Sequence, residues 1–183
     1  QINIDSADVQ KINSDIYNKL YHDIVEKELS NMSYGVSVIN LEISYDWAIN
    51  GDVLSLWTTC NDSWGGTHYI VYNVSISTGK VVNKNDLLSY VGFSEEQYIT
   101  TAEQVLGSKF WSAWDRTNEN FQNNNFISLF NEALEKTISQ ENIDQSFPYI
   151  NDKGELCIIA KVYSLAGADY YWNNLNMVNF ILV

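Results

Sequence analysis

The sequence predicts an α+β fold: an antiparallel meander packed with an N-terminal helix, then two helices and terminal antiparallel strands. Three observations favour this fold. A helical apolar period opens the chain, a period-two alternation with turn signals follows it, and helical periods in the second half precede further strand patterns. Helices and antiparallel strands that are segregated along a chain indicate α+β and not a parallel α/β sheet. The length of 183 residues predicts one large domain, or two small lobes that share a core.

The chain is expected to begin with a short strand at residues 2–4 and a helix over residues 6–27. Ser6 or Asp8 is placed to cap the first turn of this helix. Its apolar residues recur every three or four positions and therefore share one face: Val9, Ile12, Ile16, Leu20 and Ile24.

An antiparallel meander is predicted over residues 36–82. Apolar and polar side chains alternate over residues 41–49, which indicates a half-buried strand with Trp47 in the core. Asn50 and Gly51 follow, and an Asn-Gly step between two runs of strand formers is typical of a two-residue hairpin loop.

Two more strands complete this meander, at residues 53–60 and 68–76. Trp57 falls within the first of them and is expected in the core. The second strand turns at Gly79 into a short strand at residues 81–82.

The second half opens with helical patterns. A helical section is expected from residue 85, and Ser94 with Gln97 fits a capping box at the start of a helix that runs towards Trp114. Asparagines at residues 123–125 separate this helix from the next one, which carries an apolar stripe up to Leu134.

Strand patterns return near the C-terminal end. Pro148 stops helical structure, and a turn that ends at Gly154 leads into a strand at residues 156–162. A last strand is expected at residues 177–183. The aromatic-rich residues 165–176 between these strands are expected to form a loop.

The charge of the chain excludes several classes of partner. It has 10 Lys and Arg against 23 Asp and Glu, which gives a net charge of −13. Nucleic acid and anionic lipid both require a basic surface, so neither is an expected partner. A cationic partner is compatible with this charge. No apolar run is long enough to span a bilayer, and because the chain begins at Gln1 we expect a fragment or a processed ectodomain.

Few residues indicate catalysis or metal binding. His68 has two interpretations, as a base or metal ligand and as a structural hydrogen-bonding residue, and no metal-binding or phosphate-binding motif accompanies it. We therefore expect no catalytic residue, no metal and no cofactor. Cys60 and Cys157 are interpreted either as small buried side chains or as a disulfide of an exported protein.

Aromatic residues in the predicted loops are the candidate ligand-binding residues. They are Trp64, Tyr170, Tyr171 and Trp172. Loop aromatics carry a large rigid area with a polar group and are favoured binding anchors. The alternative is that they fold back and cover the sheet. On the first interpretation, Trp172→Ala weakens binding without unfolding the domain.

Several short motifs, in order along nearly the whole chain, resemble those of the PdaC/RsiV-like extracellular module. They are Ile2–Ile4 with Val9–Ile16, Asn50–Leu56, Gly65–His68 including Gly66, Ser77–Lys80 with Asn85–Leu88, Phe147–Leu156 and Tyr163–Gly167. Two features depart from the family pattern. Thr67 replaces a small residue before His68, and residues 164–170 lack the usual proline, which puts a shared ligand surface in doubt.

The resemblance implies an α+β module on the outer face of Gram-positive bacteria, with two tightly associated halves, residues 1–88 and 89–183, in one compact unit. This module occurs as the ectodomain of RsiV-type anti-sigma factors, which sense lysozyme, and beside the catalytic domain of PdaC-type peptidoglycan deacetylases. We therefore expect a non-catalytic, extracellular or surface-anchored recognition domain whose partner is a basic protein such as lysozyme or a cell-wall glycan. The alternatives are an accessory domain of a cell-wall-modifying hydrolase, and such a hydrolase itself, with His68 and a carboxylate as its catalytic groups.

Overall fold

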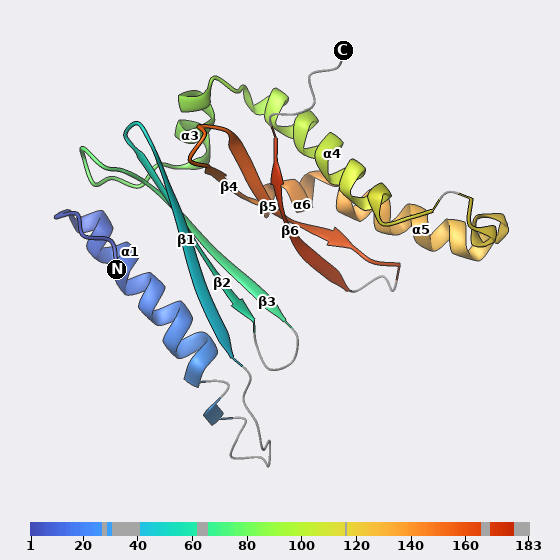
Figure 1. The fold of residues 1–183 in the computed structure, drawn as a ribbon, viewed down its shortest axis with the longest axis horizontal. Coiled ribbons are helices and arrows are strands. Elements are labelled where there is room, and N and C mark those ends of the chain that lie inside the picture. Colours follow the sequence, from blue (N-terminus) through green and yellow to red (C-terminus); the bar gives the residue numbers. More distant parts are fainter. Residues whose placement is uncertain (27–28, 31–40, 62–65, 116, 166–168, 178–183) are drawn as a thin grey trace. The chain divides into compact units, whose positions relative to one another are not determined.

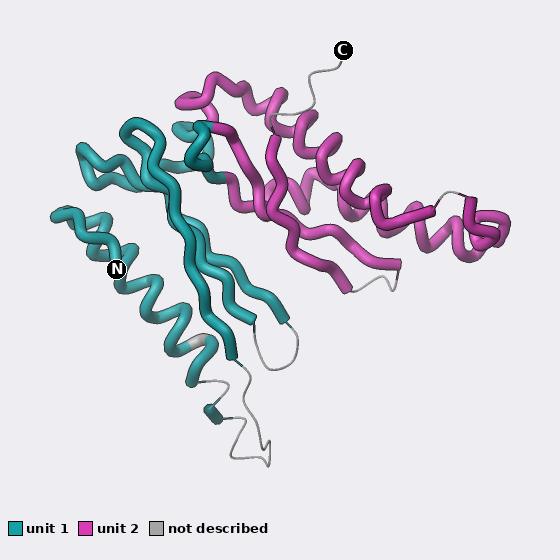
Figure 2. Tube along the Cα trace, in the orientation of Figure 1, with its two compact units in different colours: residues 1–87, 149–154 teal, residues 88–148, 155–183 magenta. Residues whose placement is uncertain are grey.

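The computed structural model of the chain describes residues 1–26, 29–30, 41–61, 66–115, 117–165 and 169–177. Helices and two antiparallel three-stranded sheets form an α+β fold, as predicted (Figure 1). The chain divides into two units, which are coloured separately in Figure 2. Unit 1 comprises Gln1–Leu87 and Tyr149–Gly154, and unit 2 comprises Leu88–Pro148 and Glu155–Val183.

Unit 1 begins with the helix α1, Ala7–Tyr17, which continues as the π-helical segment η1, Asn18–Glu26. Ser6 is its N-cap, and the Ser6 hydroxyl accepts a hydrogen bond from the Val9 N–H at 3.1 Å. The expected strand at residues 2–4 does not form. The side chain of Asn13 bonds to both the N–H and the C=O of Ile2 at 2.8 Å, so this stretch is held by the helix and not by a sheet.

The meander of unit 1 contains the strands β1, Glu42–Asn50, β2, Val53–Asn61, and β3, Thr67–Ser75, in the order β1-β2-β3. Residues 36–40 of the predicted meander lie outside the described part of the chain. Asn50 pairs with Val53, so Gly51 and Asp52 form the two-residue hairpin loop that the Asn-Gly step predicts. Beyond β3, Val81 forms only an isolated bridge with Val74.

The helix α1 packs on one face of this sheet. Its buried residues Val9 and Ile12 pack with Ile2 and with Val74 of β3, and half-buried side chains surround this cluster. These surrounding side chains are Ile4, Ile16, Leu54, Leu56 and Tyr72. The apolar face of the helix thus packs on side chains of β2 and β3.

The segment Tyr149–Gly154 packs on the other face of the same sheet. The Ile150 N–H donates to the hydroxyl of Ser55 at 3.1 Å, and that hydroxyl donates to the side-chain oxygen of Asn73 at 2.6 Å. The Tyr149 ring lies 4.4 Å, centroid to centroid, from that of Trp57. A short segment from late in the chain therefore completes the packing of the first sheet.

The helices that follow are α3, Lys84–Val91, α4, Glu95–Ser112, α5, Asn124–Thr137, and α6, Gln140–Asp144, with a 3-10 turn, η2, at Glu119–Gln122. The predicted capping box of α4 is present. The Gln97 N–H donates to the Ser94 hydroxyl at 3.1 Å, and the Ser94 N–H donates to the Gln97 side chain at 2.8 Å. Phe110 of α4 and Phe130 of α5 form an aromatic core between these helices, with ring centroids 4.9 Å apart.

The second sheet has the order β4-β5-β6, with β4 at Phe147–Ile150, β5 at Leu156–Tyr163 and β6 at Tyr170–Asn176. The loop expected at residues 165–176 is wrong over most of its length, because β6 begins at Tyr170 and pairs with β5 from Tyr163↔Tyr170 to Cys157↔Asn176. Met177 lies just beyond this strand, and residues 178–183 of the expected last strand lie outside the described residues. Tyrosine and tryptophan are strong strand formers, which accounts for the pairing.

None of the helices that the structure describes has the length and apolar character needed to cross a membrane.

Candidate functional site

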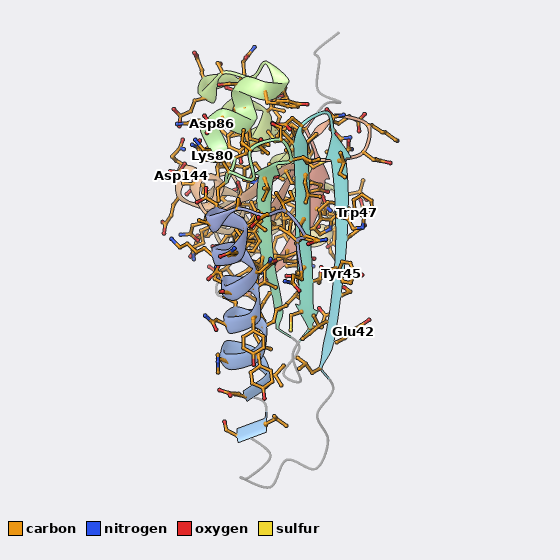
Figure 3. All side chains as sticks on the ribbon, turned by 90° about the vertical axis from the view of Figure 1, so that its left-hand side faces the viewer. Glu42, Tyr45, Trp47, Lys80, Asp86 and Asp144 are labelled. Carbon is orange, nitrogen blue, oxygen red and sulfur yellow. The ribbon has the colours of Figure 1, made fainter. Side chains whose placement is uncertain are left out.

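The edge strand β1 carries a row of exposed apolar side chains. Ile43, Tyr45, Trp47 and Ile49 are exposed by 42%, 73%, 55% and 47%. Their registers place them on the face that α1 packs against, since Trp47 pairs with Leu56, which pairs with Tyr72 of β3. Figure 3 shows the labelled Tyr45 and Trp47 on β1. The expectation that Trp47 lies in the core is wrong, because the helix packs on β2 and β3 and leaves β1 uncovered.

A groove runs along this row, between α1 and β1. Its volume is about 550 Å³, and its lining includes Ile2 and Ile16 on the helix side and Tyr45, Trp47 and Leu56 on the sheet side. A second hollow of about 780 Å³ follows α1 and η1, and Tyr17, Tyr21 and Val25 contribute to its lining. Gln1, Ile16, Leu20 and Ile43 line both spaces, so they form one continuous apolar surface.

A polar cluster ties the helix wall of the groove to the sheet. The Tyr72 hydroxyl donates to the Asp15 carboxylate, which also lies 2.9 Å from the Lys19 ammonium. The hydrogen bond from Tyr72, and then that from Lys19, hold the pKa of Asp15 below its usual value. Burial, reinforced by the Asp15 carboxylate, raises the pKa of Tyr72. These three side chains fix the spacing between the helix and the sheet next to the groove.

The sheet that forms the groove floor is acidic. Residues 41–79 contain no lysine or arginine, whereas Glu42 and Asp46 lie on β1 and Asp52 lies in its hairpin loop. Asp46 also accepts a hydrogen bond from the backbone N–H of Trp47 at 2.8 Å. The site therefore combines an apolar row with carboxylates on the same strand.

The aromatic residues predicted as ligand-binding anchors lie on β6. Tyr170 and Trp172 share one face of the strand, and the Lys161 ammonium lies 4.7 Å and 5.4 Å from their ring centroids. Trp172 also packs on Phe147 with ring centroids 5.5 Å apart, so Trp172→Ala removes a packing contact and does not test binding alone. Tyr171 points to the opposite face and is 71% exposed. Trp64 lies outside the described residues.

The groups considered for catalysis and redox chemistry are spread over the fold. His68 is exposed on β3, in register with Cys60. Gly66 lies just before β3, and Gly65 lies outside the described residues. Cys60 and Cys157 are buried thiols, so the disulfide interpretation is not met. Within the described ranges, no group of three or more His, Cys, Asp or Glu side chains is placed to hold a metal ion.

The glycines of the sequence motifs take turn conformations. Gly51, Gly79 and Gly154 have φ values of 53°, 64° and 78°. These three residues close the β1–β2 hairpin, the turn after β3 and the turn before β5, so they shape the scaffold and do not line the groove.

The groove was not predicted from the sequence. The alternation over residues 41–49 predicts the strand correctly. Its apolar side chains, which this pattern places in the core, form the exposed row instead. Comparisons of the chain with protein-family models, with curated proteins and with solved structures found no match. The observed fold and site thus define the class only as an α+β protein with an open apolar groove in an acidic sheet.

Proposed function

We propose that this protein is a non-catalytic recognition domain that binds a cationic protein through the groove between α1 and β1. The observation that carries the proposal is the row of four apolar side chains exposed along one strand. Single exposed apolar residues are ordinary, but a contiguous row beside a groove is typical of an interaction surface. Tyr45 and Trp47 are also the residue types that contribute most to binding at protein interfaces.

The charge of the chain supports a basic partner. A net charge of −13 attracts a cationic protein over long range and raises its association rate at low salt. The carboxylates of Glu42 and Asp46 bring this attraction to the strand that carries the row, although their side chains lie on its other face. The extracellular location and the lysozyme-like partner that the sequence resemblance implies belong to the same proposal.

Titration calorimetry with a basic lysozyme, at low and at moderate salt, tests this function. We expect binding that persists at moderate salt, and a dissociation constant that rises about tenfold or more in Trp47→Ala and in Tyr45→Ala. Both side chains are exposed, so circular dichroism should show that each variant stays folded.

Tyr171→Ala is the matched control, because Tyr171 is equally exposed but lies on β6. It should leave the affinity unchanged. A loss in Tyr171→Ala with no change in Trp47→Ala would move the site to β6. Binding that disappears at moderate salt would show charge attraction alone, and the same titration with cell-wall glycan fragments would then test the other expected class of ligand.

A further inference from the structure

We propose that the partner binds by strand addition, as an extended segment of alternating apolar and basic residues that pairs with the outer edge of β1. This inference rests on the proposed function, because it uses the same groove. It adds the mode of binding and the pattern of the partner sequence. Main-chain hydrogen bonds supply affinity in such complexes, and alternate side chains supply specificity.

The first step is that β1 is an edge strand. In the order β1-β2-β3, the described residues give it β2 as its single neighbour. It is nine residues long and carries apolar side chains at alternate positions, and it lacks the lysine and proline that natural edge strands use to prevent pairing. A long apolar edge of this kind is a template for another strand.

The second step concerns the direction of its peptide groups. In an antiparallel pair, successive residues direct their N–H and C=O alternately towards the partner strand and away from it. The Trp47 N–H donates to the Asp46 side chain, so Trp47 points its N–H away from β2. By alternation, Ile43, Tyr45 and Ile49 also direct their peptide groups to the outer edge. The residues that expose apolar side chains therefore also present the edge for pairing.

The third step defines the occupant. An added strand whose apolar residues continue the row over the groove places its other residues beside Glu42 and Asp46, which occupy the alternate positions of β1. Lysine or arginine at those positions forms ion pairs with the two carboxylates. The Asp46 carboxylate then releases the Trp47 N–H, which can donate to the added strand. A second copy of this chain fits poorly, because it brings the same carboxylates and the same net charge of −13.

Synthetic peptides of nine residues, matched to the length of β1, test this mode against the full chain. A capped peptide that alternates lysine with valine should bind, and its counterpart with glutamate in place of lysine should not. The lysine peptide is then N-methylated on one or the other set of alternate residues, which removes the N–H groups of one edge at a time. Strand addition requires that N-methylation of one set of residues abolishes binding and that N-methylation of the other set leaves the affinity nearly unchanged.

Two variants of one residue provide the complementary test. Tyr45→Ala removes the side chain, whereas Tyr45→Pro also removes an N–H that points to the outer edge and leaves the β1–β2 ladder intact. We expect the dissociation constant of the lysine peptide to be about tenfold higher in Tyr45→Pro than in Tyr45→Ala. Near-ultraviolet circular dichroism checks the fold, and the N-methylated peptides keep the test valid if Tyr45→Pro does not fold.

The outcomes separate this inference from the proposed function. Equal binding of the two N-methylated peptides overturns strand addition, while a loss in Trp47→Ala still supports the groove. If Trp47→Ala leaves the affinity unchanged, the groove is not the binding site and the proposed function is wrong. If sedimentation shows that the chain self-associates, and Tyr45→Pro abolishes this, the occupant of the edge is a second copy and the cationic segment is wrong.

Discussion

Tyr98 shows how burial sets the chemistry of a single residue. Its side chain is fully buried in α4, and its hydroxyl lies 2.7 Å from that of Ser146. The Ser146 hydroxyl donates to the carbonyl of Ile143 at 2.6 Å, so the Tyr98 hydroxyl is the donor to Ser146. Burial raises the pKa of Tyr98 to about 12, because the phenolate loses its hydration.

This pKa predicts that the fold loses stability in strong alkali. A tyrosine in the unfolded chain loses its proton near pH 10, which is below the folded value of about 12. The contribution of the protonated Tyr98 to the free energy of unfolding is therefore complete below pH 10 and disappears as the pH rises towards 12. We expect the free energy of unfolding to fall by about 1 kcal/mol from Tyr98 alone between neutral pH and pH 11.

Urea titrations at a series of pH values measure this effect. Tyr98→Phe is the control. Its free energy of unfolding should be about 1 kcal/mol lower at neutral pH, because the hydrogen bond to Ser146 is lost, and should fall less steeply above pH 10 than that of the unchanged protein. Identical slopes for the protein and the variant would show that Tyr98 is not the group that titrates.

At the scale of elements, Gly79 sets how α1 meets the sheet. Its φ is 64°, and a Cβ at this position would lie 2.5 Å from the Cβ of Ser6, the residue that caps α1. The Ser6 hydroxyl donates to the Gly79 carbonyl at 2.6 Å. One close approach therefore joins the turn after β3 to the start of the helix.

Two alanine variants separate the steric effect from the backbone effect. Gly92 also has a positive φ, 75°, but a Cβ there meets no atom within 4 Å. Gly92→Ala should therefore cost about 1 kcal/mol, for the backbone conformation alone. Gly79→Ala should cost about 3 kcal/mol, because Ser6 and the helix must also shift. Urea denaturation of both variants measures the difference, and equal losses would contradict the proposed docking of α1.

The elements themselves were largely predictable, because they depend on local patterns. The helical period and Ser6 predict α1, the Asn-Gly step predicts the hairpin, and Ser94 with Gln97 predicts α4. The strand β6 was missed, since Tyr170 to Trp172 are followed by asparagines that break the apolar alternation. Its pairing with β5 is a tertiary contact that the local pattern does not contain.

The candidate site was less predictable than the fold. Whether Tyr45 and Trp47 are buried depends on where α1 packs, and the alternation in β1 contains no information on the position of the helix. The aromatics that the sequence did single out, Tyr170 and Trp172, pack around Lys161 instead of standing free in a loop. Burial is a property of the assembled elements, so sequence patterns identify strands better than exposed faces.

At the scale of the whole molecule, the first sheet depends on residues that arrive late in the chain. The Ile150 N–H bonds to Ser55, and these residues are 95 positions apart in sequence. Ser55 is fully buried, and its hydroxyl also donates to Asn73 on β3. A single hydroxyl thus connects the central strand, its neighbour and the returning segment Tyr149–Gly154.

Ser55→Ala should therefore destabilise the protein by about 1–3 kcal/mol, because the buried Ile150 N–H loses its acceptor. The same variant should speed the hydrogen exchange of the Ile150 amide more than that of amides within α5, since the returning segment opens locally. Ser14→Ala is the control, because Ser14 is exposed and its hydroxyl donates to the Gln10 carbonyl within its own helix, so its effect should stay within about 0.5 kcal/mol. If both variants are equally stable, the long-range bond does not hold the segment, and the ring contact between Trp57 and Tyr149 must supply that stability.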